Sequence, residues 1–417
     1  MKSNTIPTIQ LAKIKKLIAV NNPESFALAV ALLSTLEAGE DQWLEIISKK
    51  RCEILLELRN DTVTTLFLEA SIARPRLRER VWCAGSTAIQ FLTTLSDAAA
   101  ELLSKHKGDL WLSGLTTLSD AAAESLSKLK GDLHLGGMTT LSDAAAESLS
   151  KLKGTLYLGG LTPLSDAAAE LLSKHKGKLW LRGLTTLSDA AAESLSKHRG
   201  NLDLGLLPGG AGLAQLSDAA AESLGKHKGD LCLDGLTQLS DAAAESLGKH
   251  KGALDLGGLA QLSDAAAESL SKLKGDLHLD RLTTLSDAVA ESLSKHRGHL
   301  KLGTDRGRGL SLAQLSDAAA ESLGKHKGDL ELRGLAQLSD AAAESLSKLK
   351  GGLDLRGLTQ LSDAAAESLS KLKSLDLQGL TQLSGAAVES LAKVPWVYLS
   401  GSVNARVRKV KFGASRF

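Results

Sequence analysis

The sequence predicts an α/β solenoid, with a parallel strand ribbon on the concave side, helices on the convex side and an all-helical N-terminal cap. Three observations predict this class. One phrase occurs thirteen times between Leu95 and Leu399, nearly always 23 residues apart. Within each copy the hydrophobic period changes from helical to alternating, and residues 1–85 contain no repeat. A fixed period of this length indicates units that bury their apolar faces only by stacking on neighbours.

Residues 1–85 are predicted to be helical. Asn22-Pro23-Glu24 supplies an N-cap, a proline at the first helical position and an acidic side chain near the helix dipole, and Gly39 ends this helix. Further helical runs cover roughly 41–58 and 62–73. Because a solenoid needs caps over the apolar ends of its stack, we expect an N-terminal cap here. An independent functional domain is the alternative.

Each repeat is predicted to begin with a helix, as in the copy Leu118–Gly137 (LSDAAAESLSKLKGDLHLGG). Its apolar residues recur at positions one, five, nine and twelve, which is the spacing of one helical face. Ser119 or Asp120 is the expected N-cap. Gly131 is expected to end the helix as a left-handed cap.

A short strand follows each helix. Leu133-His134-Leu135 alternates apolar and polar residues, so its leucines point into the core and the middle residue points outwards. Thirteen such strands, from 110–112 to 397–399, predict one parallel ribbon roughly 60 Å long. The solenoid is therefore expected to cover 86–400, followed by a basic C-terminal tail over 401–417.

These residues resemble the leucine-rich repeat family, and bacterial members in particular. Leu133–Met138 (LHLGGM) is similar to the family's LxLxxN segment, and SDAAAESL to the variable half of the repeat. The sequence departs from the pattern where the family has Asn, since the equivalent residues are apolar: Leu115, Met138, Leu161 and Leu184. A ladder of apolar side chains should replace the family's buried amides. The resemblance implies binding through the concave face, and no particular ligand.

The composition argues against several classes of partner. Lys and Arg number 50 against 48 Asp and Glu, so no global field favours nucleic acid or a membrane surface. Three unpatterned cysteines indicate a reducing compartment. The N-terminus lacks a secretory pattern, and the most apolar stretch, 26–33, is too short to cross a bilayer. We expect a cytoplasmic protein.

The copies differ most in the middle residue of each strand. In order, these residues are Trp111, His134, Tyr157, Trp180, Asp203, Cys232, Asp255, His278, Lys301, Glu331, Asp354, Asp376 and Tyr398. The first four place aromatic rings on neighbouring strands, expected at roughly 5 to 10 Å intervals. Because exposed apolar area marks contact sites, these four are predicted binding residues.

Acidic residues gather on the fifth to eighth repeats. The predicted acidic stretch consists of Asp203, Asp230, Asp234, Asp255, Asp276 and Asp280. Lys301, Arg306, Arg308, Arg333 and Arg356 then restore positive charge. The acidic stretch favours a basic partner, and a solvated face that varies freely is the alternative. Two longer units, with insertions at 205–213 and 303–312, flank this stretch and either extend the binding face or reflect neutral slippage.

No catalytic, phosphate-binding or dinucleotide motif occurs in the sequence. Histidines such as His227 share a slot with leucines of other repeats and are interpreted as helix-end residues near terminal carbonyls. Cys232, Asp255 and His278 lie on three successive strands, which span nearly 10 Å and reach one metal ion poorly. We therefore expect no metal, no cofactor and no small-molecule substrate.

The function predicted from sequence is that of a non-enzymatic scaffold holding a protein or peptide along its concave strand face. The alternative is a structural spacer or self-assembly unit without a specific concave ligand. The basic tail either protects the last strand from edge-to-edge pairing or contacts an anionic surface.

Overall fold

A computed structural model describes residues 92–207, 209, 210, 212–303 and 312–412, together with 13, 14, 16, 29, 30 and 33. The chain divides into two compact units, Met1–Leu184 and Thr185–Phe417. The expected N-terminal cap and the inserted Arg306 and Arg308 fall outside the described residues, apart from six isolated positions before residue 34. The cap therefore stays a prediction.

Unit one contains four strand–helix repeats, which we call rungs and number by their strands. Its described elements are α7 (Asp97–Leu103), β1 (Leu110–Trp111), α8 (Asp120–Leu126), β2 (Leu133–His134), α9 (Asp143–Leu149), β3 (Leu156–Tyr157), α10 (Asp166–Leu172) and β4 (Leu179–Trp180). The four strands are parallel and pair in chain order.

Unit two contains the remaining nine rungs and a terminal helix. Its described helices are α11 (Asp189–Ser196), α12 (Asp218–Leu224), α13 (Asp241–Leu247), α14 (Asp264–Leu270), α15 (Asp287–Ser294), α16 (Asp317–Leu323), α17 (Asp340–Leu346), α18 (Asp363–Leu369), α19 (Gly385–Leu391) and α20 (Gly401–Phe412). Its strands are β5 (Leu202–Asp203), β6 (Leu231–Cys232), β7 (Leu254–Asp255), β8 (Leu277–Leu279), β9 (Leu300–Leu302), β10 (Leu330–Glu331), β11 (Leu353–Asp354), β12 (Ser374–Asp376) and β13 (Trp396–Tyr398).

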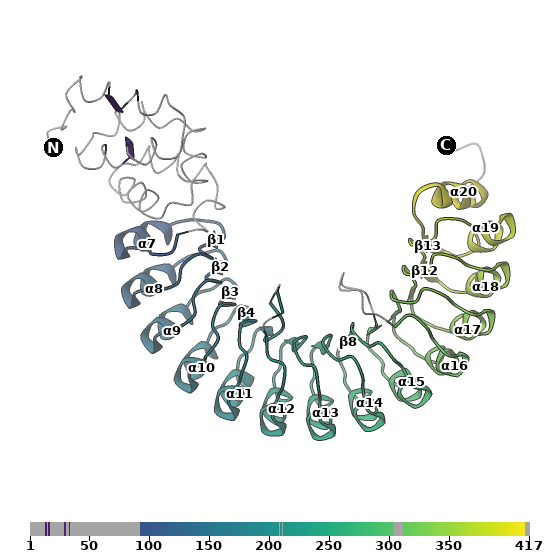
Figure 1. The fold of residues 1–417 in the computed structure, drawn as a ribbon, viewed down its shortest axis with the longest axis horizontal. Coiled ribbons are helices and arrows are strands. Elements are labelled where there is room, and N and C mark those ends of the chain that lie inside the picture. The colour runs from purple at the N-terminus through teal and green to yellow at the C-terminus, as the bar shows by residue number, and fades with distance from the viewer. Residues whose placement is uncertain are drawn as a thin grey trace. The chain divides into compact units, whose positions relative to one another are not determined.

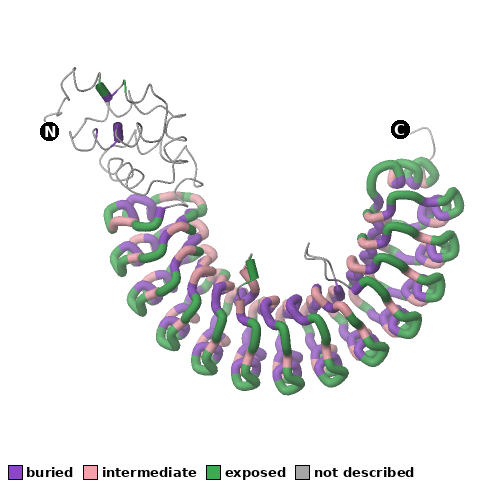
Figure 2. Tube along the Cα trace, viewed as in Figure 1, coloured by how far each residue is buried: buried purple, intermediate pink, exposed green. Residues whose placement is uncertain are grey.

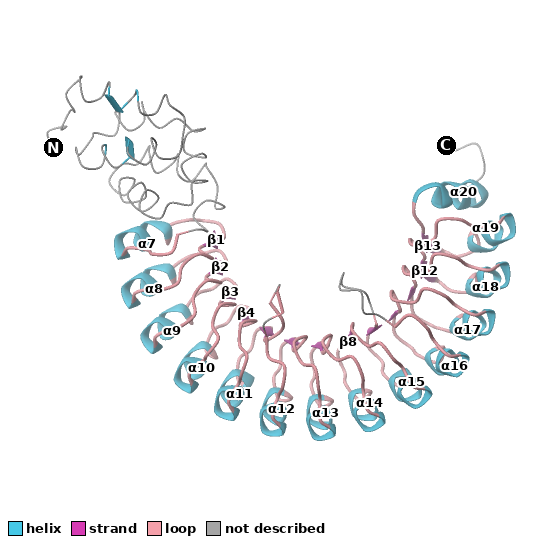
Figure 3. Ribbon diagram, viewed as in Figure 1, coloured by secondary structure: helices cyan, strands magenta, loops and turns pink. Residues whose placement is uncertain are grey.

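Parallel strands alternate with helices, as predicted for a solenoid of leucine-rich repeats. Within each unit the strands line the inner side and the helices form the outer side (Figure 1 and Figure 3). None of the described helices is long and apolar enough to cross a membrane.

The core is a set of ladders in which each apolar residue packs on its counterpart in the next rung. Leu133 is paired in register with Leu156, one repeat length away, and both are fully buried. The apolar ladder that replaces the family's asparagines is confirmed, since Leu115, Met138 and Leu161 are at most 1% exposed. Figure 2 shows this buried layer between strands and helices in both units.

A serine begins each repeat helix and also links it to the preceding rung. The hydroxyl of Ser142 accepts a hydrogen bond from the N–H of Ala145 (3.1 Å) and donates one to Asp120 (2.5 Å). Serine, and not the aspartate after it, is thus the N-cap. The aspartate lies in the first turn, where it favours the helix dipole and receives the next rung's serine.

The prediction for Gly131 was wrong. Helix α8 ends at Leu126 with Ser127 as a right-handed C-cap, and Gly131 is not among the glycines with positive φ in the described chain. A Cβ at Gly131 would instead clash with the carbonyl oxygen of Gly108 in the preceding rung. Glycine is required because two backbones approach closely there, not because of a left-handed turn.

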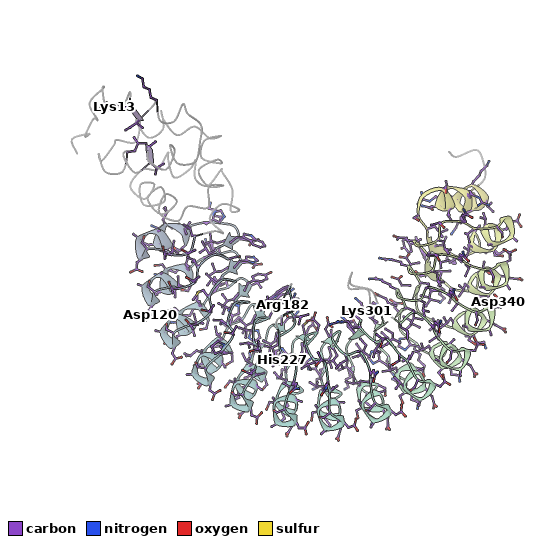
Figure 4. All side chains as sticks on the ribbon, in the orientation of Figure 1. Lys13, Asp120, Arg182, His227, Lys301 and Asp340 are labelled. Atoms are coloured by element: carbon purple, nitrogen blue, oxygen red, sulfur yellow. The ribbon has the colours of Figure 1, made fainter. Side chains whose placement is uncertain are left out.

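A row of histidines lies inside the solenoid. His175, His198, His227, His250, His296 and His326 are at most 1% exposed. The rings of His198 and His227 stack with centroids 6.0 Å apart, and those of His227 and His250 at 6.1 Å. Figure 4 labels His227 within unit two. Backbone groups of Ser196 and Gly200, in the preceding rung, lie beside His227, so the carbonyl contacts expected from the sequence run between rungs.

Burial keeps these imidazoles neutral. The pKa of His227 is lowered to about 4, first by burial and then by the adjacent His198 and His250. The pKa of His296 is lowered to about 4 by burial and by His326. Leucine fills this slot in other rungs, so the position is one of the core.

The C-terminal tail contains a helix that packs on the last rung. Helix α20 contacts α19 and buries Val403 and Val407, which are 2% and 1% exposed. Arg406 donates to the carbonyl of Leu383 (2.8 Å), and Lys411 donates to the carbonyl of Pro395 (2.8 Å). Two basic residues of the tail thus satisfy carbonyl groups at the end of the stack.

We predict that the histidine row makes the solenoid sensitive to acid. A histidine with a lowered pKa in the folded state contributes its full stability to the fold when the pH is above the unfolded-state pKa, near 6.5. This contribution is lost as the pH falls toward the folded-state pKa of about 4. His227→Leu with His296→Leu should remove about 3 kcal/mol per histidine of that loss. Urea unfolding between pH 7 and pH 4 measures it. His106→Leu, at a half-buried histidine of the same slot, should change the pH dependence of the unfolding free energy less. The same pH dependence in wild type, the double variant and His106→Leu would contradict the prediction.

We also predict that α20 stabilises the end of unit two. Val403→Asp with Val407→Asp places charges in an apolar contact and should cost roughly 2 kcal/mol or more per site. Val410→Asp is the matched control, because Val410 is 49% exposed on the same helix. The melting temperature should fall for the double variant and stay near wild type for the control. Equal melting temperatures would show that α20 contributes nothing.

Candidate functional site

The middle residues of β1–β4 form one stacked column, which we call the aromatic ladder: Trp111, His134, Tyr157 and Trp180. The ring centroids of Trp111 and His134 are 3.6 Å apart and nearly parallel. His134 and Tyr157 are 3.8 Å apart at 11°, and Tyr157 and Trp180 are 4.8 Å apart at 49°. These spacings are shorter than the predicted range; the first two pairs of rings are stacked and the third pair is tilted.

The last ring of the ladder is covered by a cation. The guanidinium carbon of Arg182 lies 4.3 Å from the ring centroid of Trp180. Figure 4 labels Arg182 on the strand side of unit one. The rings of the ladder are thus held on one another and on this cation, with stacked contacts from Trp111 to Tyr157 and a tilted contact from Tyr157 to Trp180.

Exposure and charge vary along the ladder. Trp111 is 42% exposed, whereas His134 is only 8% exposed between its neighbours. Burial lowers the pKa of His134, against the opposing effect of Asp132 and Asp109. Burial and the same two carboxylates raise the pKa of Tyr157. The ladder therefore presents a neutral imidazole and a neutral phenol at physiological pH.

The six predicted aspartates divide into two groups. Asp230 and Asp276 precede their strands and hold the next rung, since Asp230 accepts from the N–H of Ala253 (3.0 Å) and Asp276 from that of His299 (2.9 Å). Asp109 does the same for Asp132 in unit one. Asp230 and Asp276 thus have structural contacts that the sequence reading did not foresee.

The other four aspartates share the strand face of rungs 5–8, and we call them the acidic patch: Asp203, Asp234, Asp255 and Asp280. Asp203 accepts from the N–H of Gly205 (3.0 Å), and Asp234 from that of Leu206 (2.5 Å) at the base of the first longer unit. Asp255 accepts from Gly257 (2.9 Å). Burial, followed by Asp203, Asp255 and Asp234, raises the pKa of the Cys232 thiol, which stays protonated.

Three of the five residues predicted to restore positive charge, Lys301, Arg333 and Arg356, lie beside acidic side chains, and the other two, Arg306 and Arg308, fall outside the described residues. Arg333 lies 3.0 Å from Glu331 and donates to Asp354 at 2.7 Å. Arg356 in turn donates to Asp376 at 2.7 Å. Lys301, labelled in Figure 4, lies 3.8 Å from Glu331. Arg333 and Arg356 lie two residues after Glu331 and Asp354, on the same side of the ribbon, and each also pairs with the acid of the next rung.

Two sets of possible metal ligands occur on the described strand face. One is Cys232, Asp234 and Asp255, and the other is Asp255, His278 and Asp280; the ligand atoms in each set lie within 4.8 Å of one another. Each set uses only two adjacent rungs, unlike the three-rung combination considered from the sequence. The sequence could have indicated both sets, because the first and third residues of Cys-Leu-Asp and of His-Leu-Asp lie on the same face of a strand.

Two cavities lie on the helix side of unit two, at the two places where a longer unit separates consecutive helices. One, of about 800 Å³, lies between α11 and α12, and the other, of about 440 Å³, lies between α15 and α16. Their linings are polar and include Arg199 and Arg297 respectively. Neither cavity includes residues of the strand face.

Comparison with known proteins gives distant structural similarity only. No family model matches the chain, and no curated protein matches it. An internalin from Listeria monocytogenes aligns with TM-score 0.43 and 18% identity over 82% of this chain and 95% of its own. Toll, from the Toll–Spätzle complex of Drosophila, aligns with TM-score 0.49 and 15% identity over 74% of this chain and 42% of its own. The TLR13–ssRNA13 complex gives TM-score 0.46 and 19% identity over 77% of this chain and 48% of its own.

Proposed function

We propose that the chain is a non-enzymatic scaffold that binds a protein or peptide on its strand face, with the aromatic ladder as the principal contact. The observation that supports this proposal is the continuous stack from Trp111 to Trp180, with Trp111 42% exposed. Large aromatic side chains dominate the energy of protein interfaces, and Trp and Tyr are enriched among the residues that contribute most.

The stacking makes the ladder a preorganised surface. Each ring is held by its neighbours, so a partner need not order these side chains on binding, and less conformational entropy is lost. The aromatic rings supply a partner with apolar area and with ring edges that carry partial positive charge, and Trp and Tyr side chains also carry N–H and O–H donors. Such a surface favours carbonyl oxygens, aromatic faces or proline rings, which an extended peptide supplies.

The acidic patch supports a basic partner for unit two. Asp203, Asp234, Asp255 and Asp280 place four carboxylates on one face, although the net charge of the chain is only +2. A local field of this kind attracts cationic segments and weakens as salt screens it. In the competing function, a spacer or self-assembly unit, neither the ladder nor the patch has a specific ligand.

We predict that peptides selected by display against the full chain depend on the ladder. Trp111→Ala with Trp180→Ala should weaken binding by roughly 2 kcal/mol per ring, about 30-fold for each. Trp396→Ala is the matched control, because Trp396 is 68% exposed on β13 and outside the ladder. Fluorescence titration measures both affinities. If the double variant keeps its fold and binds as wild type does, the ladder is not the binding site.

A second prediction concerns salt. A lysine- and arginine-rich peptide should bind unit two with an affinity that falls as ionic strength rises. Replacing Asp203, Asp234, Asp255 and Asp280 with Asn should remove that dependence, whereas Asp230→Asn with Asp276→Asn should lower stability and leave the salt slope in place. Titration calorimetry at low and high salt distinguishes the cases. An unchanged slope in the fourfold variant would identify the patch as a solvated face.

A further inference from the structure

Asp255 and His278 face each other across β7 and β8 at the distance of a long ion pair. The two residues are register partners, and Nδ1 of His278 lies 3.8 Å from Oδ2 of Asp255. This exceeds a hydrogen bond, for which donor and acceptor lie within about 3.2 Å. It is close to the separation, roughly 3 to 3.5 Å, of two ligands that each lie about 2.1 Å from one metal ion.

The fold places a third donor beside this pair. Asp280 follows His278 by two residues and lies directly after the end of β8, so both side chains are on the same face of the ribbon. Asp280 is 1% exposed, and its ligand atom lies within 4.8 Å of those of Asp255 and His278. The side chains of His278 and Asp255 are 21% and 17% exposed, so one side of the set remains accessible to solvent.

A glycine leaves room at the centre of the set. A Cβ at Gly257 would lie 2.8 Å from Oδ1 of Asp255 and 3.3 Å from Oδ2 of Asp280. Carboxylate oxygens from two rungs thus converge above a position without a side chain. In rungs 10 and 11 the equivalent position holds an arginine, Arg333 or Arg356, whose guanidinium pairs with the carboxylates around it. Rungs 7 and 8 carry Gly257 and Asp280 there instead.

We propose that Asp255, His278 and Asp280 bind one divalent transition-metal ion of the zinc class, with water completing its coordination. One imidazole nitrogen and two carboxylate oxygens suit such an ion better than Mg²⁺ or Ca²⁺, which favour all-oxygen sites. The ion takes the electrostatic place that arginine has in rungs 10 and 11. The site does not include the ladder of unit one, but it shares Asp255 and Asp280 with the acidic patch; zinc titration without peptide tests the site separately from binding of a basic partner.

The neighbouring set, Cys232 with Asp234 and Asp255, is the less suitable of the two. Oδ1 of Asp234 accepts a hydrogen bond from the N–H of Leu206 in the preceding rung at 2.5 Å, at the base of the first longer unit. The bond that Oδ1 of Asp255 accepts from Gly257 (2.9 Å) lies within its own rung and leaves Oδ2 facing His278. Both sets share Asp255. The ion is therefore assigned to the histidine set, and the two assignments differ in whether a thiolate is bound.

The test is calorimetric titration of the full chain with zinc after treatment with a chelator. One equivalent should bind, and His278→Ala or Asp255→Asn should weaken binding at least about tenfold. Gly257→Ala should also weaken it without removing a ligand, because the added methyl displaces the Asp255 carboxylate. Gly136→Ala, at the same strand position with an open surrounding, and His299→Ala, at a nearby histidine, are matched controls that should bind as wild type does.

Cobalt spectroscopy separates the two sets. Cobalt bound by the histidine set gives no thiolate-to-metal absorption, and Cys232→Ser leaves its spectrum unchanged. A thiolate band that disappears in Cys232→Ser would overturn the assignment, as would zinc affinity that is unaffected by His278→Ala, or absence of binding to the wild-type chain. Circular dichroism checks that each variant is folded. If a ligand variant does not fold, Asp280→Asn is tested in its place.

Discussion

Each residue in a rung lies against its own counterpart in the next, and the rest of the structure follows from this constraint. Leu133 pairs with Leu156, and Gly131 lies against Gly108. A residue type is therefore acceptable at a given position only if it tolerates a copy of itself about 5 Å away. Leucine, alanine and glycine meet this requirement in the core. A column of equal charges does not, because like charges at this distance repel.

The polar positions show how the repeat meets that requirement. The helix-opening serine does not meet the next serine; it donates to the preceding aspartate, as Ser142 does to Asp120. On the helix surface Glu124 pairs with Lys128 of its own helix at 3.4 Å, a contact that contributes little energy but places opposite charge beside each member of the glutamate and lysine columns. The buried histidines do form a column of identical titratable groups. They remain neutral in it, because burial, and then His198 and His250, lower the pKa of His227.

The strand face follows the same constraint with different residues in each rung. Aromatic rings accept one another as neighbours and stack, as Trp111 and His134 do. Acidic side chains on adjacent strands repel each other unless a cation lies between them, and arginines supply that cation beside Asp354 and Asp376. Between Asp203 and Asp255 the intervening rung carries Cys232, whose raised thiol pKa keeps that position neutral.

The period predicted the strand, the helix face, the serine cap and the apolar ladder, because each depends on residues within one repeat or on their exact copies. It did not predict contacts between different residue types in neighbouring rungs. Arg333 pairing with Asp354, and Asp280 approaching Asp255, depend on side-chain direction at alternate strand positions. The role of Gly131 was missed because a helix end and a close backbone approach both call for glycine. Helix α20 lies after the last repeat, so the period could not predict it.

Near-identity of the rungs has a consequence for how the chain finds its alignment during folding. The helix of one rung presents the same alanines, leucine and serine as that of any other, so a partly folded array has little to distinguish a correct neighbour from one displaced by a whole repeat. The two longer units, at Gly205–Leu213 and Gly303–Leu312, break this translational symmetry. They divide the array into shorter runs, in which fewer misaligned pairings compete. Mispaired, slowly rearranging intermediates are thus expected to form within the runs of equal rungs, and not across the longer units.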